Sequence, residues 1–103
     1  MNLFGLTERD VHTITGILSK YPSILRVHIF GSRAKGNFKT GSDIDLAIMN
    51  EGFTREELIR IKADFSESSS PFFVDIVSYP ELTHLELKEH IDRVGVSFYN
   101  KNS

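Results

Sequence analysis

Two short stretches decide the fold of this chain: IFGSRAKG at residues 29–36 and SDIDLAI at residues 42–48. The first closes an apolar run rich in β-branched residues, which predicts a strand over residues 24–30. The second opens another apolar run, which predicts a strand over residues 43–49. Only one helical turn and a short loop join them, and this favours an antiparallel pair over a full crossover.

Two aspartates stand one residue apart at the start of the second strand. Side chains alternate between the faces of a strand, so Asp43 and Asp45 point the same way. Adjacent carboxylates repel each other unless a cation lies between them, which makes a metal ion their natural partner. A solvated strand face is the alternative interpretation, and the alternation alone leaves it open.

A glycine and a serine follow the first strand. Gly31 lets the backbone approach a ligand closely. Ser32 is expected to be the N-cap of a helical turn over residues 32–35, whose free N–H groups can hold phosphate. A phosphate-binding turn beside paired carboxylates suggests chemistry on a nucleoside triphosphate.

A third apolar run, at residues 72–78, predicts another strand, with Asp75 in its middle. A carboxylate is costly to bury there unless it is paired or bound to a metal. If this strand lies beside the second one, Asp75 converges with Asp43 and Asp45. Oxygen ligands of this kind suit Mg²⁺.

Helix signals lie between these strands. Thr7, followed by acidic residues, and Thr54, with Glu57 three residues later, each predict the start of a helix. Pro22 is expected to stop the first helix. Loops are predicted over residues 36–41 and 66–71.

The last helix is expected to have Pro80 in its first turn and to end at Gly95. Its buried side is expected to comprise Leu82, Leu85 and Ile91. Residues 96–99 then form an edge strand or a tail that faces a partner. The whole pattern predicts an α/β (α+β) fold, a small mixed β-sheet with helices packed against it.

The composition narrows the function. The chain has 103 residues, no cysteine and a formal net charge of −2. We expect a single domain over residues 1–103, without disulfides or a thiolate zinc site. The charge argues against direct nucleic-acid binding. No apolar run reaches the length of about 20 residues that a membrane span needs, and no signal-peptide pattern is visible, so we expect a cytoplasmic protein.

The pattern of Gly-Ser, ten residues and Asp-x-Asp resembles the nucleotidyltransferase superfamily that includes DNA polymerase β and the aminoglycoside nucleotidyltransferases. GSRAKG followed by SDIDLAI is most similar to the minimal nucleotidyltransferases. These short proteins are usually encoded beside a helical HEPN protein, and many act as the antitoxin of that pair. The resemblance covers almost the whole chain and implies a polymerase β-like nucleotidyltransferase fold.

The resemblance also implies roles for individual residues. Asp43 and Asp45 match the metal-binding pair, and Asp75 matches a third carboxylate that helps to bind a second metal and deprotonates the acceptor. The implied catalytic cofactor is therefore Mg²⁺, as two ions, with ATP as substrate. Contacts with the nucleotide are expected from four residues: Gly31, Ser32, Arg33 and Lys35.

Two functional hypotheses follow. In the first, the protein moves AMP from ATP to a hydroxyl on a HEPN-type partner encoded by an adjacent gene, and this silences the partner as a toxin. In the second, it is a non-catalytic nucleotide-binding subunit that neutralises or completes a helical partner by contact. Antibiotic adenylylation is disfavoured, because the chain is too short for a second domain to shape a drug site.

Overall fold

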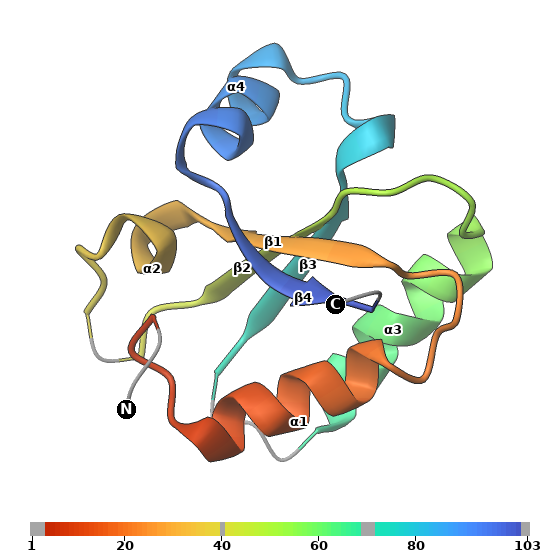
Figure 1. Ribbon diagram of the computed structural model, residues 1–103, viewed down its shortest axis with the longest axis horizontal. Coiled ribbons are helices and arrows are strands. Elements are labelled where there is room, and N and C mark those ends of the chain that lie inside the picture. The colour runs from red at the N-terminus through yellow and green to blue at the C-terminus, as the bar shows by residue number, and fades with distance from the viewer. Residues whose placement is uncertain (1–3, 40, 69–71, 102–103) are drawn as a thin grey trace.

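A four-stranded mixed sheet forms the centre of the computed structural model (Figure 1). The structure describes residues 4–39, 41–68 and 72–101. Residue 40 and residues 69–71, which belong to the two predicted loops, lie outside the described residues. The strands are β1 (Arg26–Phe30), β2 (Ile44–Ile48), β3 (Val74–Ser78) and β4 (Val96–Asn100). The helices are α1 (Glu8–Leu18), α2 (Gly31–Lys35), α3 (Arg55–Glu67) and α4 (Leu85–Val94), with a 3₁₀ turn at Tyr79–Glu81.

The strand order in the sheet is β3-β2-β1-β4. β1 runs antiparallel to both β2 and β4, whereas β2 and β3 are parallel. The predictions of an antiparallel pairing between β1 and β2 and of a mixed sheet are both confirmed. The last segment is an edge strand, one of the two alternatives left open for residues 96–99. Because β2 and β3 are parallel, both begin at the same end of the sheet.

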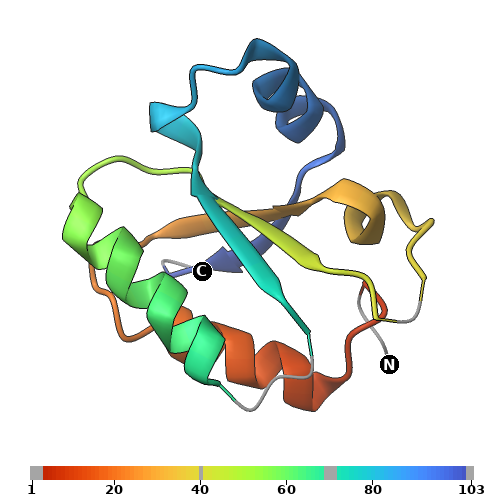
Figure 2. The same cartoon turned by 180° about the vertical axis from the view of Figure 1, so that it is seen from behind.

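The two faces of the sheet are covered differently (Figures 1 and 2). α1 and α3 pack side by side on one face, and α4 covers part of the other. The main core lies under α1 and α3, where the alternating apolar residues of the strands meet the helices. Its fully buried members include Ile14, Leu18, Val27, Ile29, Ile44, Leu46, Ile48, Ile61 and Ile76.

A smaller apolar cluster joins α4 to the opposite face. It consists of Phe30, Ala47 and Ile91, with partly buried side chains around them. This cluster is built on the even-numbered residues of β1 and the odd-numbered residues of β2. Asp45 and Asp75 belong to the same face but lie near the strand starts. The candidate site therefore shares a sheet face with α4.

Thr7 and Thr54 are the N-caps of α1 and α3, as predicted, and both form capping boxes. In α3, Thr54 Oγ1 accepts from the Glu57 N–H at 3.1 Å, and Glu57 Oε1 accepts from the Thr54 N–H at 2.8 Å. Ser23 adds a hydroxyl that donates to Glu57 Oε2 at 2.7 Å. The last contact ties the start of α3 to the loop before β1.

Three predictions about helix ends and faces need correction. α1 ends at Leu18, before Pro22 is reached, and Ser19 is its C-cap. Pro80 lies in the 3₁₀ turn, and α4 begins later, at Leu85. The N-cap of α4 is His84, whose side chain accepts from the Leu87 N–H at 3.1 Å. Leu85 is 72% exposed, because the later start of the helix turns it away from the sheet. Ile91 is buried and Gly95 follows the last turn, as predicted.

Asn50 links two strands of the sheet, a role that the sequence pattern did not indicate. Its side chain is buried at the end of β2. Asn50 Oδ1 accepts from the N–H groups of Leu25 and Arg26 at 2.9 and 3.1 Å. Its amide nitrogen donates at 2.8 Å to the carbonyls of Ser23 and Glu51. The start of β1 is thereby fixed to the end of β2.

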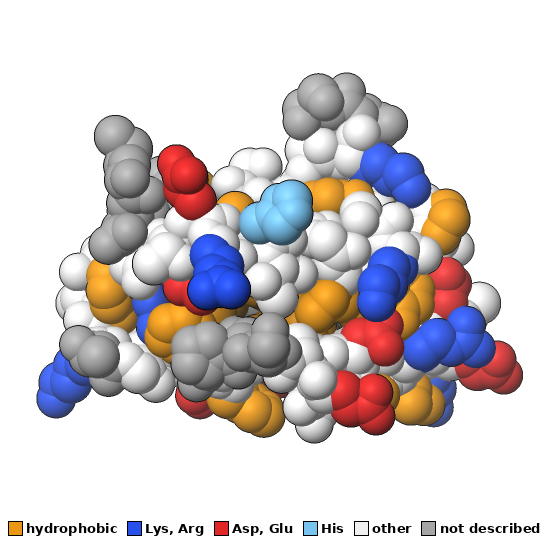
Figure 3. All heavy atoms as spheres, turned by 90° about the horizontal axis from the view of Figure 1, so that it is seen from below, with side chains coloured by type: hydrophobic (Ala, Val, Ile, Leu, Met, Phe, Trp, Pro, Cys, Tyr) orange, Lys and Arg blue, Asp and Glu red, His pale blue; other side chains and the backbone are white. Residues whose placement is uncertain are grey.

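The surface seen from the α1 side carries interspersed acidic and basic side chains (Figure 3). That face shows no continuous basic stripe of the kind that tracks a nucleic-acid backbone. Among the residues that the structure describes, no helix is both long and apolar enough to cross a bilayer.

Candidate active site

The parallel pairing of β2 and β3 places two carboxylates side by side. Asp45 and Asp75 are direct partners in the register of these strands. Both project from the sheet face that α4 covers in part. The sequence could predict this meeting only on the condition that the two strands were neighbours, and the structure fulfils that condition.

Asp45 is the more enclosed of the two carboxylates. Burial, followed by the negative charges of Asp75 and Asp43, raises its pKa to about 6. Asp43 and Asp75 are both exposed. Three acidic groups are thus close enough to interact, and the one in the middle is held in an unfavourable electrostatic environment.

Gly31 makes room for this carboxylate. It begins α2 with a φ of +76°, directly after Phe30, which is the antiparallel partner of Asp45. A Cβ atom at residue 31 would collide with Asp45 Oδ2 and lie 3.3 Å from Asp45 Cγ. A side chain here would therefore be strained by its backbone and would push the Asp45 carboxylate away.

The acidic residues form an open arrangement. In the described parts of the chain, no three His, Asp or Glu side chains are gathered tightly enough to enclose a metal ion unaided. Mg²⁺ does not need such a cage, since it keeps several waters and shares its coordination with substrate phosphates. The repulsion at Asp45 is relieved by a divalent cation, so the donor set fits Mg²⁺ in chemistry and charge.

The environment of Asp75 corrects one step of the sequence argument. The sequence argument rested on the cost of burying a carboxylate in the middle of an apolar run, yet Asp75 is exposed. The reason is that β3 is an edge strand and α4 does not cover its first residues. Asp75 therefore remains accessible to a partner molecule without a burial cost.

Arg33, for which a contact with the nucleotide is expected, is a buried residue. It is only 2% exposed. Nε and Nη2 donate to the carbonyl of Ser42 at 3.1 and 2.8 Å, and Nη1 donates to the carbonyl of Phe4 at 2.9 Å. The guanidinium carbon also lies 5.1 Å from the Phe38 ring centroid and 4.6 Å from that of Phe72.

These contacts connect Arg33 to both acidic strands. Ser42 directly precedes Asp43, and Phe72 comes shortly before β3, which carries Asp75. Burial lowers the pKa of Arg33, and the nearby charges of Asp10 and Asp43 oppose that shift. The hydrogen bonds of Arg33 thus hold the backbone at Phe4 and at Ser42, directly before Asp43.

Ser32 and Lys35 lie on the short helix beside this cluster. Ser32 is half-buried and Lys35 is exposed. Ser32 was predicted to be the N-cap, but the cap is Phe30, whose side chain makes no capping hydrogen bond, and the helix already begins at Gly31. The N-cap therefore lies two residues earlier than expected.

Sequence reasoning missed the contribution of the N-terminal segment. The carbonyl of Phe4 accepts from Arg33, and the Phe4 ring packs 6.2 Å from that of Phe98. A Cβ atom at Gly5 would collide with the Phe38 ring and lie 3.0 Å from Arg33 Nη1. The only signal available was a glycine between two apolar residues, which is too common to identify a contact.

Comparisons with known proteins identify the family of this chain. Residues 12–103 match the family described as Polymerase beta, Nucleotidyltransferase. The chain is also 33% identical, over 99 residues, to the probable protein adenylyltransferase MntA of Haemophilus influenzae. That alignment covers 93% of this chain and 84% of the relative.

Solved structures share the fold. A toxin–antitoxin structure with AMP-PNP has a TM-score of 0.70 at 20% identity, covering 87% of this chain and 73% of that chain. A complex of a tri-AMPylated HEPN toxin with its MNT antitoxin, from Shewanella oneidensis, has a TM-score of 0.66 at 16% identity. It covers 92% of this chain and 73% of the other.

Proposed function

We propose, from the premise that this chain belongs to the polymerase beta nucleotidyltransferase family, that it transfers AMP from ATP to a hydroxyl group of a HEPN-type helical partner. The observation that carries the proposal is the register pairing of Asp45 with Asp75, beside a glycine that admits the Asp45 carboxylate. It places acidic ligands on two adjacent strands where a short helix begins. This arrangement suits phosphate chemistry at an oxygen-ligated metal.

Each acidic residue has a part in the proposed reaction. Asp43 and Asp45 would hold Mg²⁺ together with the triphosphate, and Asp75 would help to hold a second ion. The metal supplies neutralisation of charge on the phosphates and on the leaving group. The exposed carboxylate of Asp75 takes the proton of the attacking hydroxyl.

The proposed reaction is a single displacement at the α-phosphorus. The acceptor oxygen forms a bond to the α-phosphorus, and the bond from that phosphorus to the oxygen bridging to the β-phosphate breaks. Pyrophosphate leaves. We assign contacts with the triphosphate to Gly31, Ser32 and the exposed Lys35, whereas Arg33 acts by positioning.

The partner follows from the relatives. The curated relative is a probable protein adenylyltransferase, and one structure of the same fold is an MNT antitoxin bound to a tri-AMPylated HEPN toxin. We therefore infer that the acceptor is presented by the partner, and that the reaction takes place in the cytoplasm, where ATP is available.

Intact-protein mass spectrometry tests the transfer. The HEPN-type protein encoded beside this chain is incubated with it, Mg²⁺ and ATP, and separately with the Asp43→Asn and Asp75→Asn variants. We expect the partner to gain one or more adenylyl masses with the unaltered chain. Each variant should be slower by about 10²-fold or more, because the loss of one ligand removes several kcal/mol of transition-state stabilisation.

Glu56→Gln is the matched control, since it removes one exposed carboxylate from the first turn of α3. It should leave the transfer unchanged. No adenylyl gain with any protein, together with a stable complex that still silences the partner, would contradict the transferase. That result would favour the alternative of a subunit that neutralises its partner by contact.

A further inference from the structure

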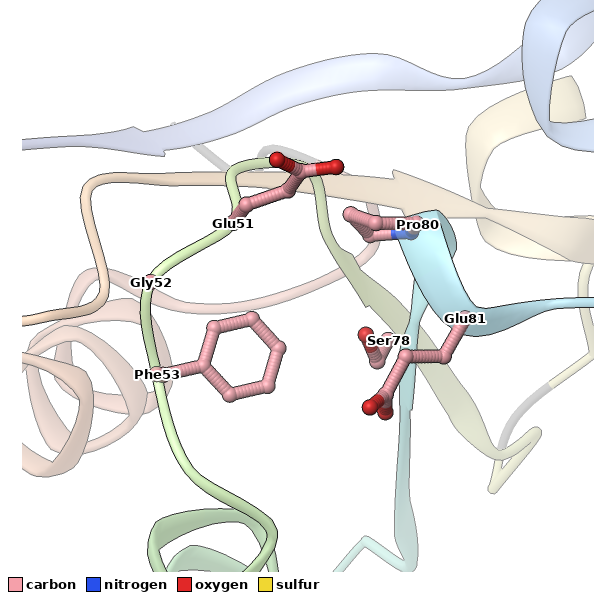
Figure 4. A pocket seen from close by; sticks show the side chains of 6 residues that line it. All are labelled: Glu51, Gly52, Phe53, Ser78, Pro80 and Glu81. Atoms are coloured by element: carbon pink, nitrogen blue, oxygen red, sulfur yellow. The ribbon is translucent and has the colours of Figure 1, made fainter.

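A cavity lies away from the acidic cluster, at the opposite end of the parallel strands β2 and β3. It has a volume of about 240 Å³. Its lining comes from the loop after β2 and from the end of β3 with the 3₁₀ turn that follows: Glu51, Gly52, Phe53, Ser78, Pro80 and Glu81 (Figure 4). Ser78 is three residues from Asp75 along β3, a distance of about 10 Å, and it faces the other side of the sheet.

The hydroxyl of Ser78 is unpaired in this cavity. Ser78 is 6% exposed, and its Oγ has no hydrogen-bond partner among the residues that the structure describes. Figure 4 shows the hydroxyl on the side of Ser78 that faces the Phe53 ring across the cavity. A buried hydroxyl left without a partner costs about 1–3 kcal/mol, so a ligand that pairs with it gains an interaction that the empty fold lacks.

The walls define the chemistry of such a ligand. The rings of Phe53 and Pro80 are apolar, while Glu51 and Glu81 are exposed and bring two carboxylates to the rim. Among the residues that the structure describes, no lysine or arginine lines this cavity. Lys88 instead lines a neighbouring hollow and lies 5.1 Å from the Tyr79 ring centroid. The cavity therefore favours a cation that can also stack on an aromatic face.

The size and rigidity of the cavity further restrict the ligands that it can bind. Ligand pockets for drug-sized molecules begin at roughly 300 Å³, so this cavity suits a side-chain-sized group better than a nucleotide. The Glu51 wall is held in place by its carbonyl, which accepts from Asn50 Nδ2 at 2.8 Å. The site is thus formed before any ligand arrives.

We propose that this cavity binds a guanidinium group, which stacks on the Phe53 ring, pairs with Glu51 and Glu81, and donates a hydrogen bond to Ser78 Oγ. A planar guanidinium can make these three interactions together, because it carries five hydrogen-bond donors and its flat face can stack on an aromatic ring. The group can come from a free small molecule or from an arginine side chain of another protein. The proposal does not depend on the nucleotidyltransferase activity.

NMR titration of the ¹⁵N-labelled chain at pH 7 tests the site with argininamide and with a capped Gly-Gly-Arg-Gly-Gly peptide. We expect saturable shifts at residues 51–53 and 78–81, with a dissociation constant on the order of 1–10 mM for so small a ligand. The same peptide with citrulline, which is neutral and of equal shape, should bind at least about tenfold more weakly. Tighter binding of the peptide than of argininamide would identify a protein arginine as the source, and the reverse would identify a small molecule.

Two variants and a control complete the test. Ser78→Ala should weaken binding about fivefold while leaving the midpoint of urea unfolding unchanged or higher, because it removes an unpaired hydroxyl. Glu81→Gln should weaken it about three- to tenfold, whereas Glu8→Gln on α1 should not. Equal binding of the citrulline peptide, shifts centred on Asp43 and Asp75, no saturable shift, or unchanged binding by Ser78→Ala would each overturn the proposal.

Discussion

Asp45 combines burial with repulsion in a single side chain, and this has a consequence for stability. Its pKa in the folded chain is about 6, above the unfolded value of 3.8, mainly because of burial and then because of its acidic neighbours. Between these values the folded state binds more protons than the unfolded state, so this residue makes stability fall as the pH rises from about 4 to about 6. Above pH 6 the full penalty remains.

We therefore predict that Asp45→Asn stabilises the metal-free chain at pH 7.5 and has little effect near pH 4. The shift corresponds to about 3 kcal/mol, and solvent screening of a half-buried group reduces the expected gain to about 1–2 kcal/mol. Urea unfolding of both proteins across this pH range measures it. Glu56→Gln, which removes an exposed carboxylate, should show no comparable difference, and an Asp45→Asn curve parallel to the unaltered one would contradict the prediction.

Arg33 leads to a prediction about kinetics. Arg33→Lys keeps the charge but cannot donate to Ser42 and Phe4 together or stack as a plane between two rings. For Arg33→Lys we expect kcat to fall by about tenfold or more and the Mg²⁺ concentration needed for half-maximal activity to rise. The KM for ATP should change less than about twofold. Lys35→Met is the contrasting variant, and it should raise the KM for ATP. A large rise in KM with unchanged kcat in Arg33→Lys would show instead that Arg33 contacts the nucleotide.

At the scale of the elements, Asn50 makes four hydrogen bonds, and three of them join the end of β2 to the start of β1. Asn50→Asp keeps the acceptor but replaces the donor with an oxygen that faces two carbonyls. We predict a loss of about 2–4 kcal/mol in the free energy of unfolding at pH 7, because buried backbone groups lose their partners. Urea denaturation measures this loss. The same change at Asn37, an exposed loop residue, should cost less than about 0.5 kcal/mol.

The elements also show what the sequence could and could not predict. The apolar run after Asp43 was enough to predict β2, and the short connection from β1 was enough to predict their antiparallel pairing. The parallel partnership with β3 was only a condition, because register depends on contacts between distant residues. The start of α4 was placed too early, since Pro80 is compatible with a 3₁₀ turn as well as a first helical turn.

The sequence predicted which residue types make up the candidate site. It did not predict which contacts each side chain makes in the fold. A basic residue beside Gly31 and Ser32 reads equally well as a phosphate ligand or as a buried anchor. Only the positions of Phe4, Phe38 and Phe72, which come from three separate parts of the chain, decide that Arg33 is buried. The local sequence pattern around Arg33 contains no information about contacts between residues so far apart in the chain.

For the molecule as a whole, the proposed site predicts linked stability. A ligand that binds only the folded state at 100 times its dissociation constant adds about 2.7 kcal/mol. For a domain of this length, that gain raises Tm by roughly 10–20 °C. We expect Mg²⁺ with AMP-PNP to produce it, and differential scanning calorimetry to record it. Asp43→Asn should lose most of the increase; an equal increase in that variant would place the nucleotide elsewhere.

The hydrogen bond from Arg33 to the Phe4 carbonyl has a practical consequence for anyone who handles this protein. We expect an affinity tag or fusion joined ahead of residue 4 to lower the measured activity if it displaces the Phe4 carbonyl from Arg33. The other end is safer for such additions. The Lys101 N–H donates to the Leu25 carbonyl at 2.9 Å, at the end of β4, on the opposite sheet edge from β3 and Asp75.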